Sequence, residues 1–186
     1  MNVIPTQIPE VLIVEPQVFG DPRGYFLETY QGKRYEAAGM ADTFVQDNVS
    51  FSRRGTLRGL HFQHPQEQAK LVQVLSGDIF DVAVDVRRGS PTFGRWVGVH
   101  LSAGQPRQLY VPRGFAHGFC VLSDTALFMY KCSDYYAPAH EAGFCWDDPD
   151  VGIAWPVQKP LLSDRDRAFP PCLCDDLCFA LMLFRV

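Results

Sequence analysis

Apolar and polar residues alternate most regularly in the segment 79–86. Successive side chains of an extended strand point to opposite faces, so this alternation predicts one apolar face and one acidic face. The apolar face carries Phe80, Val82, Val84 and Val86. The opposite face carries Asp81, Ala83 and Asp85. Ser-Gly-Asp at 76–78 separates this strand from the apolar run 71–75 and predicts a hairpin turn between them.

The same two-residue period recurs further along the chain, in WVGVHLS (96–102) and RQLYVP (107–112). The segment 125–132 predicts another strand with one inward face, formed by Ala126, Phe128, Tyr130 and Cys132. Its other face carries Leu127, Met129 and Lys131. Many short strands separated by Gly and Pro indicate an all-β sandwich or barrel, with a helix expected near residues 32–40.

Composition narrows the class of protein. The 186 residues are 47% hydrophobic and 20% charged, which fits one folded domain over residues 1–186. A net charge of −4 disfavours nucleic acid as a partner but leaves room for a local basic pocket. The N-terminus lacks a secretory signal, and no apolar run reaches the ~20 residues of a membrane helix. We therefore expect a cytoplasmic protein with no membrane partner, whose six cysteines are free thiols.

Two histidines, His61 and His64, lie close together in LRGLHFQH (57–64). Histidine is the commonest protein ligand for transition metals, but two ligands on one face of a strand should be two residues apart. These two are three apart, and the residue two past His61 is Gln63, a poor ligand. We predict no metal site here, nor in the segment 172–178, whose C-x-C-x3-C spacing differs from that of a zinc ribbon.

His61 has two other interpretations, as a structural core histidine or as part of an ionic site. Arg58, His61 and Lys70 gather cationic groups along an otherwise apolar region, and His117 follows a tight turn in VPRGFAHGF. Buried cations without partners are costly, so such a cluster indicates an anionic ligand or internal carboxylates. A bulge at Gly59 would turn both Arg58 and His61 inward.

Eight features then occur in a fixed order: FGDPRGYFLE (19–28), FVQDNVS (44–50), TLRGLHFQ (56–63), Lys70, DVAVDVRRGSPTFG (81–94), VPRGFAHGF (111–119), YKCSDYYAPAHE (130–141) and LLSDRD (161–166). Together they resemble the dTDP-4-dehydrorhamnose 3,5-epimerase family of the cupin superfamily. The resemblance runs over roughly residues 1–167, which is nearly the whole chain. It fades in the tail 167–186, for which there are two hypotheses: a divergent segment packed on a dimer, or the product of an altered reading frame.

The resemblance implies a cupin-type jelly-roll β-barrel with a few short helices, a homodimer, and a reaction that uses no metal and no organic cofactor. The implied substrate is the dTDP-sugar dTDP-4-dehydro-6-deoxy-D-glucose. Inversion at carbons 3 and 5 would give dTDP-4-dehydro-L-rhamnose, a precursor for bacterial surface polysaccharide. The 4-keto group acidifies the hydrogens on both carbons, so the reaction needs a base, an acid on the opposite face and a cation beside the enolate.

The resemblance also implies roles for individual residues. His61 matches the family's base, and the ordinary pKa of a histidine, about 6.5, suits that work. Asp166 matches the acid that orients this histidine, Tyr130 the opposite proton donor, and Lys70 the cation at the keto oxygen. The implied substrate-binding residues are Arg23, Glu28, Gln46, Asn48, Arg58, Lys70, His117, Tyr136, Glu141 and Arg165.

Some of these binding residues carry further expectations. Tyr136 matches the aromatic that stacks on thymine, and arginine suits phosphate because its donors form a fork. Arg165 stands where the family commonly has lysine. Because family members exchange N-terminal segments between subunits, Arg23 and Glu28 are expected in the neighbour's site. His64 has no matching role and is expected to be structural.

Three other functions stay open on the sequence. A relative that inverts only one carbon would use the same base and acid. A metal-dependent cupin oxygenase would need an H-x-H pair, which the chain lacks. A silent sugar-nucleotide binding module would have no need for a base, an acid and a cation together.

Overall fold

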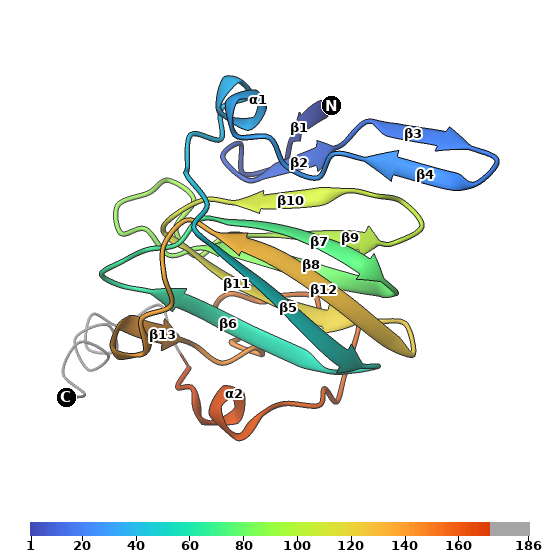
Figure 1. Ribbon diagram of the computed structural model, residues 1–186. Coiled ribbons are helices and arrows are strands. Elements are labelled where there is room, and N and C mark those ends of the chain that lie inside the picture. The colour runs from blue at the N-terminus through green and yellow to red at the C-terminus, as the bar shows by residue number, and fades with distance from the viewer. Residues whose placement is uncertain (172–186) are drawn as a thin grey trace.

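The computed structural model describes residues 1–171 and consists mainly of two packed antiparallel sheets (Figure 1). The six-stranded sheet has the order β1 (Asn2–Pro5), β2 (Leu12–Glu15), β10 (Gln108–Val111), β7 (Lys70–Ser76), β12 (Thr125–Cys132) and β5 (Gln46–Arg53). The five-stranded sheet has the order β13 (Glu141–Gly143), β6 (Leu57–Gln63), β11 (Phe115–Val121), β8 (Asp78–Asp85) and β9 (Trp96–Ser102).

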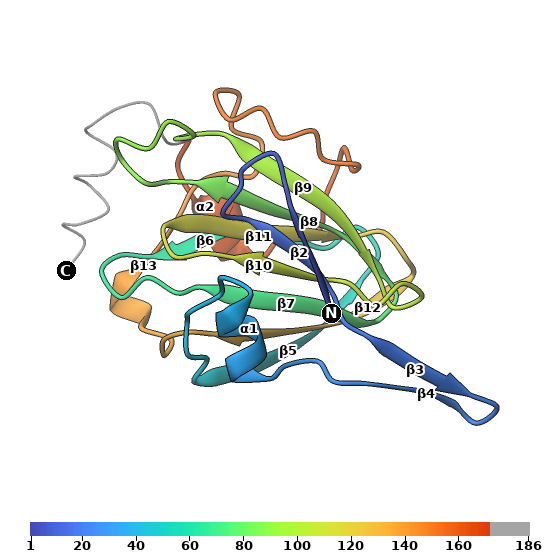
Figure 2. The same cartoon turned by 90° about the horizontal axis from the view of Figure 1, so that it is seen from above.

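The remaining elements lie outside these sheets. β3 (Val18–Asp21) and β4 (Gly24–Leu27) form a hairpin that projects from the body of the molecule (Figures 1 and 2). The helical segments are α1 (Gly32–Ala37), α2 (Asp164–Ala168) and a single 3₁₀ turn, η1 (Pro138–His140). α1 confirms the helix that the sequence predicts near residues 32–40.

The sheets enclose an apolar core between them, which confirms the predicted all-β jelly-roll fold. Four strands of each sheet face one another, β5–β12–β7–β10 and β6–β11–β8–β9, as in a jelly roll. Val72, Phe128 and Leu109 from one sheet pack with Phe119 and Ile79 from the other. The inward face predicted for β12 is confirmed, because Ala126, Phe128 and Cys132 are almost fully buried.

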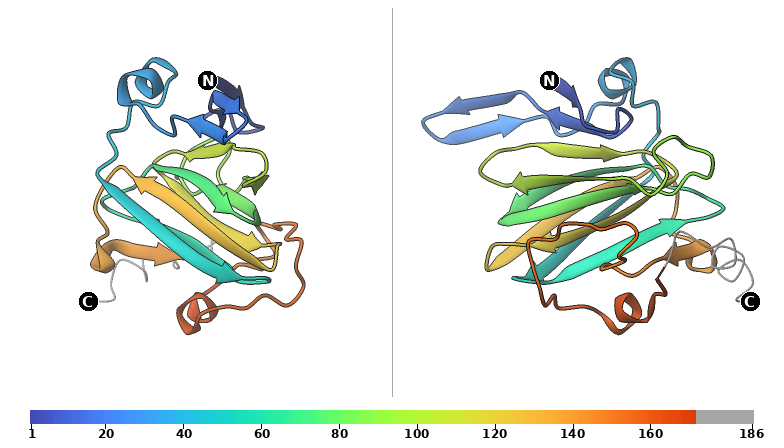
Figure 3. Two further views of the ribbon diagram at one scale, coloured as in Figure 1. Left: turned by 45° about the vertical axis from the view of Figure 1, so that its right-hand side comes forward. Right: turned by 180° about the vertical axis from the view of Figure 1, so that it is seen from behind.

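The two predicted faces of β8 are also confirmed, but both are buried. Val82 and Val84 on the apolar face pack against Phe144 and Val151, in the segment that follows β13. This segment crosses the outside of the five-stranded sheet (Figure 3, right). The acidic face therefore points into the interior of the sandwich, where Asp81 has no exposed surface.

The hairpin predicted at 76–78 is wrong. β7 and β8 belong to different sheets, so at Gly77 the chain crosses from one sheet to the other. Gly77 has φ +83°, and a Cβ atom there would lie 2.1 Å from the Thr125 carbonyl oxygen. A Gly-Asp sequence indicates that the chain turns locally. It does not determine whether the two strands on either side of the turn pair with each other, because that depends on which sheet each strand joins.

Candidate active site

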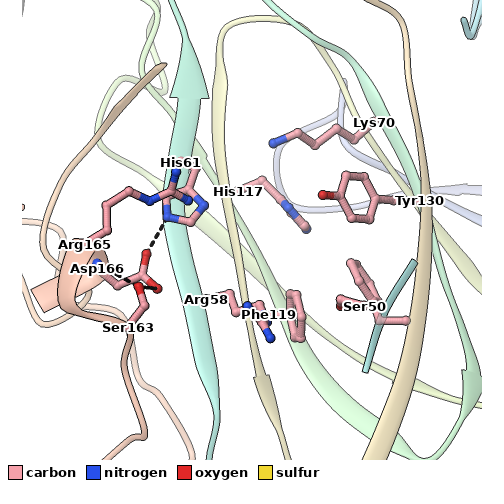
Figure 4. A pocket seen from close by; sticks show the side chains of 11 residues that line it. Ser50, Arg58, His61, Lys70, His117, Phe119, Tyr130, Ser163, Arg165 and Asp166 are labelled. Atoms are coloured by element: carbon pink, nitrogen blue, oxygen red, sulfur yellow. Dashed lines mark hydrogen bonds and ion pairs between the residues drawn. The ribbon is translucent and has the colours of Figure 1, made fainter. Parts of the chain in front are cut away.

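A cavity of about 380 Å³ lies between the sheets (Figure 4). Its walls are formed by Ser50, Arg58, His61, Lys70, His117, Phe119, Phe128, Tyr130, Ser163, Arg165 and Asp166. A neighbouring cavity of about 320 Å³ shares His61, Lys70, Tyr130 and Arg165 with it. The second cavity also contacts the predicted binding residues Gln46, Asn48, Tyr136 and Glu141.

A bulge in β6 brings Arg58 and His61 to the same cavity. His61 is paired with His117, and Arg58 with Phe119, so three residue steps on β6 face two on β11. Gly59 has φ +128°, and a Cβ atom there would lie 2.5 Å from the Gly118 Cα atom. Glycine is therefore required where the strands approach, and the bulge expected at this position is confirmed.

The mouth of the cavity holds a histidine–carboxylate pair. His61 Nε2 lies 2.5 Å from Asp166 Oδ1, although 105 residues separate them in sequence. Ser163 begins α2: its Oγ accepts a hydrogen bond from the Asp166 amide at 3.0 Å and donates one to Asp166 Oδ2 at 2.7 Å. Burial alone would raise the pKa of Asp166, but the hydrogen bonds from His61 and Ser163 leave it below its ordinary value.

Phe169 covers the His61 ring from the side of α2, and sequence reasoning missed it. The two ring centroids are 5.6 Å apart. The Pro170 carbonyl accepts a hydrogen bond from the Cys145 amide at 3.0 Å, and Gly143 leaves the space that the phenyl ring fills. Residues just beyond the last recognisable motif are thus part of the site. The cysteines at 172–178 lie outside the described residues.

A second histidine–carboxylate pair lies deeper, with His117 in the cavity wall and the fully buried Asp81 behind it. His117 Nε2 is 2.9 Å from Asp81 Oδ1, and the imidazole stacks on Phe128 at 6.2 Å. Burial raises the pKa of Asp81, although the proximity of His117 and the charge of Lys70 oppose the rise. Sequence reasoning did not propose Asp81 as a site residue, but the acidic face of β8 was the signal that pointed to it.

Tyr130 and Lys70 face His61 from the opposite wall (Figure 4). Burial raises the pKa of Tyr130, which keeps its phenol protonated, and burial lowers the pKa of Lys70. Within residues 1–171, neither the Tyr130 hydroxyl nor the side-chain nitrogen of Lys70 has a protein hydrogen-bond partner. Both groups are thus available to a molecule that enters the cavity.

Polar side chains continue around the mouth. Arg58 Nε donates to Ser52 Oγ at 3.1 Å, which leaves its terminal nitrogens available. Tyr136 donates its hydroxyl hydrogen to Glu141 Oε2 at 2.9 Å, and Arg165 forms an ion pair with the same carboxylate. These groups form a rim that is partly cationic and partly aromatic.

The structure does not bring Arg23 and Glu28 to this cavity. Arg23 is at the exposed tip of the β3–β4 hairpin, where it pairs with Asp21 at 2.6 Å. Glu28 follows β4 and pairs with Arg34 at 2.5 Å. Their expected place in a neighbour's site stays a prediction.

His64 lies away from the cavity, as expected for a histidine without a chemical role. Its Nδ1 is 3.4 Å from Glu67 Oε1, on the surface. In residues 1–171, no group of three or more His, Cys, Asp or Glu side chains is arranged to hold a metal ion. The described helices include none that is long and apolar enough to cross a membrane.

The geometry suits proton transfer at a carbon atom. A histidine held by a carboxylate is on one wall, a phenol is on the other, and the side-chain nitrogen of Lys70 lies beside the phenol. A base and an acid on opposite faces of a bound ring can remove a proton from one side and return it on the other. A cation nearby can stabilise the negative charge that develops between the two steps.

Comparison with known proteins agrees with this chemistry. The family model described as dTDP-4-dehydrorhamnose 3,5-epimerase matches residues 5–173. The dTDP-4-dehydrorhamnose 3,5-epimerase of Shigella flexneri is 58% identical over 168 residues, which cover 89% of this chain and 93% of the relative. That of Pseudomonas aeruginosa is 57% identical over 162 residues, which cover 86% and 90%.

Solved structures of epimerases also resemble this chain. The dTDP-6-deoxy-D-glucose-3,5-epimerase of Legionella pneumophila, in complex with dTDP-4-keto-L-rhamnose, superposes with a TM-score of 0.89 at 55% identity and covers 91% of each chain. A 3′-monoepimerase of Streptomyces bikiniensis, in complex with dTDP-quinovose, has a TM-score of 0.83 at 42% identity and covers 89% of this chain and 85% of its own. The chain therefore belongs to the dTDP-4-dehydrorhamnose 3,5-epimerase family.

Proposed function

We propose that this protein inverts carbons 3 and 5 of dTDP-4-dehydro-6-deoxy-D-glucose and so produces dTDP-4-dehydro-L-rhamnose for dTDP-rhamnose biosynthesis. The observation that carries the proposal is the arrangement of His61 with Asp166 on one wall of the cavity and Tyr130 with Lys70 on the other. The identity of 58% to a named epimerase supports the same reaction.

His61 acts as the base in this proposal. An Asp166 carboxylate that accepts the N–H of one ring nitrogen fixes the tautomer and leaves the lone pair on the other nitrogen, which points toward the cavity (Figure 4). That nitrogen removes the hydrogen from carbon 3 or carbon 5. The electron pair of the C–H bond forms a double bond to carbon 4, and the negative charge moves to the former keto oxygen, which gives an enolate.

Lys70 and Tyr130 complete each inversion. The Lys70 ammonium has no other partner in the described protein, and an enolate oxygen beside it offsets the cost of its burial. Tyr130 donates its hydroxyl proton to the carbon from the face opposite His61, so the configuration is inverted. His61 then carries an extra proton and Tyr130 lacks one, and exchange with solvent restores both before the second carbon reacts.

The nucleotide occupies the rim. We assign the diphosphate to Arg58 and Arg165, because guanidinium groups bind phosphate through paired donors. Tyr136 stacks on thymine, with Gln46, Asn48 and Glu141 around it. His117 supports the sugar from the bottom of the cavity.

We also propose a homodimer in which the β3–β4 hairpin reaches the neighbour. The hairpin exposes 69% of Phe26 and 66% of Tyr25, and the outer face of β5 exposes 62% of Phe51. Apolar surfaces of this kind are usually covered by a protein partner. A second copy would cover them and bring Arg23 and Glu28 to a cavity. The unpaired thiols of Cys120, Cys132 and Cys145 support a reducing, cytoplasmic location.

Mixing two inactive variants tests the exchanged hairpin. Arg23→Ala and His61→Asn should each be inactive alone as homodimers. A mixed dimer has one site with a native His61 and a native Arg23 from the neighbour, so random exchange should restore about a quarter of the wild-type activity. No recovery after unfolding and refolding the mixture would place Arg23 in its own subunit's site, and an active Arg23→Ala homodimer would place Arg23 outside any site.

The reaction itself is tested in deuterated water with EDTA present, by NMR and mass spectrometry of the product. Deuterium at carbons 3 and 5 of an L-rhamno product is the expected result. Deuterium at only one carbon would favour a single-site epimerase. The likeness to the S. bikiniensis monoepimerase supports this second candidate. Absence of exchange, or activity that EDTA abolishes, would contradict the proposal.

A further inference from the structure

The Ser50 hydroxyl is a buried polar group without a hydrogen-bond partner. Among the side chains of residues 1–171, it is the only buried nitrogen or oxygen atom in this situation. Buried polar groups in folded proteins are nearly always paired, so an exception in the wall of a candidate active site indicates a partner that arrives with the ligand.

Its neighbours on the same face of β5 are already engaged. Side chains alternate along the strand, so Asn48, Ser50 and Ser52 share the face that points between the sheets. Asn48 accepts a hydrogen bond from Gln46 at 3.1 Å, and Ser52 accepts one from Arg58. The Ser50 side chain lies between them in the cavity wall, and rotation between staggered rotamers can turn its hydroxyl toward the ligand (Figure 4).

Strand register fixes where Ser50 lies relative to the reacting groups. Ser50 is opposite Phe128, and Tyr130 is two residues further along β12. Lys70 is opposite Cys132, another two residues beyond Tyr130 in the same direction. Tyr130 therefore lies between them, with Lys70 toward one end of the cavity and Ser50 toward the other (Figure 4).

We propose that the Ser50 hydroxyl hydrogen-bonds to the 2-hydroxyl group of the sugar, an inference that rests on the proposed function. When the 4-keto oxygen is at Lys70, the far side of the six-membered ring carries carbon 1, the ring oxygen and carbon 2. The hexose ring of the substrate has free hydroxyls only on carbons 2 and 3, and carbon 3 is adjacent to the keto group. The 2-hydroxyl is therefore the one nearest Ser50, and a serine can both donate to it and accept from it.

The test compares two substrates in wild type and Ser50→Ala. With dTDP-4-dehydro-6-deoxyglucose, kcat/KM should fall about tenfold in the variant. With the 2-deoxy analogue the bond is already absent, so the variant should differ from wild type by less than about twofold. An equal loss on both substrates, or no loss on either, would overturn the proposal.

Two controls separate a substrate contact from a structural role. Ser50→Ala removes a hydroxyl that has no protein partner, so its melting temperature and its affinity for dTDP alone should equal those of wild type. The matched variant Ser52→Ala removes the hydroxyl that holds Arg58 and should weaken dTDP binding. A lower melting temperature or weaker dTDP binding in Ser50→Ala would contradict the inference. Failure of the wild-type protein to turn over the parent substrate would instead overturn the proposed function.

Discussion

Two histidine–aspartate pairs hold the imidazoles that line the cavity, His61 and His117, in different surroundings. His61 and Asp166 lie at the mouth, where 21% of the His61 side chain is exposed. His117 and Asp81 lie deeper, and the Asp81 side chain has no exposed surface. The pKa of Asp166 is below its ordinary value, whereas the pKa of Asp81 is above it.

The difference follows from the deeper burial of Asp81 and from the hydrogen bonds that each carboxylate receives. Burial raises the pKa of both groups, but Asp166 also accepts a hydrogen bond from the Ser163 hydroxyl at the start of α2. Asp81 has only His117 as a hydrogen-bond donor and Lys70 as a nearby charge. The same two residue types thus provide a charged support for the proposed base in one place and a buried anchor for an imidazole in the other.

Replacement of His61 should have the largest effect. His61→Asn removes the base but keeps a polar side chain, and we expect kcat to fall by about three orders of magnitude, because general bases contribute 10²–10⁴-fold. Binding of dTDP measured by calorimetry should be unchanged. The control is His64→Asn, three residues away and outside the cavity, which should keep wild-type turnover. A His61→Asn protein with more than about a tenth of wild-type kcat would refute the role of this residue.

The two aspartates should differ in importance for turnover. Asp166→Asn replaces a charged acceptor with an amide that cannot stabilise the imidazolium, so we expect kcat to fall about 10²-fold. Asp81→Asn changes a carboxyl group whose charged form is already disfavoured by burial, so a loss of about tenfold or less is expected. Steady-state kinetics at pH 7.5 checks both values, and an Asp81→Asn protein slower than Asp166→Asn would reverse the comparison.

The two aspartates should contribute to the stability of the wild-type protein with opposite dependence on pH. The folded-state pKa of Asp166 is lowered, so its contribution is complete above the unfolded pKa of about 4 and is lost as the pH falls. The folded-state pKa of Asp81 is raised, so its contribution is present below about pH 4 and is lost as the pH rises.

Urea unfolding at a series of pH values measures the free energy of unfolding of wild type and of each aspartate variant. On going from about pH 6 to about pH 3.5, the stability advantage of wild type should shrink over Asp166→Asn and grow over Asp81→Asn. Slopes of the same sign would show that the two carboxylates share one electrostatic environment after all.

Phe169 should have the smallest effect. Its ring packs against the His61 ring and does not line the cavity, so Phe169→Ala should lower kcat about three- to fivefold by loosening the His61 ring, with little change in KM. Phe169→Leu, which keeps apolar cover, should restore most of the loss. An increase in KM with constant kcat would mean that Phe169 acts on substrate binding instead.

Several parts of the fold could be predicted from the sequence because they depend on local pattern. The two-residue period of 125–132 determined which side chains of β12 face inward. The Arg-Gly-Leu-His spacing indicated the bulge that brings Arg58 and His61 together, because only an extra residue can place positions three apart on one face. Most of the predicted site residues lie around two neighbouring cavities. The family motifs along the chain predicted these residues.

Other features were decided only by the tertiary structure. The Ser-Gly-Asp turn at 76–78 connects different sheets, because sheet membership depends on strands distant in sequence. The acidic face of β8 points inward only because the segment after β13 covers its apolar face. Asp81 contacts His117 from the neighbouring strand, Phe169 packs on His61 from the segment after α2, and Ser50 lies in the cavity wall. No local spacing encodes these positions. Sequence patterns record which side of a strand avoids water, but the partner on that side is chosen by the packing of the whole chain.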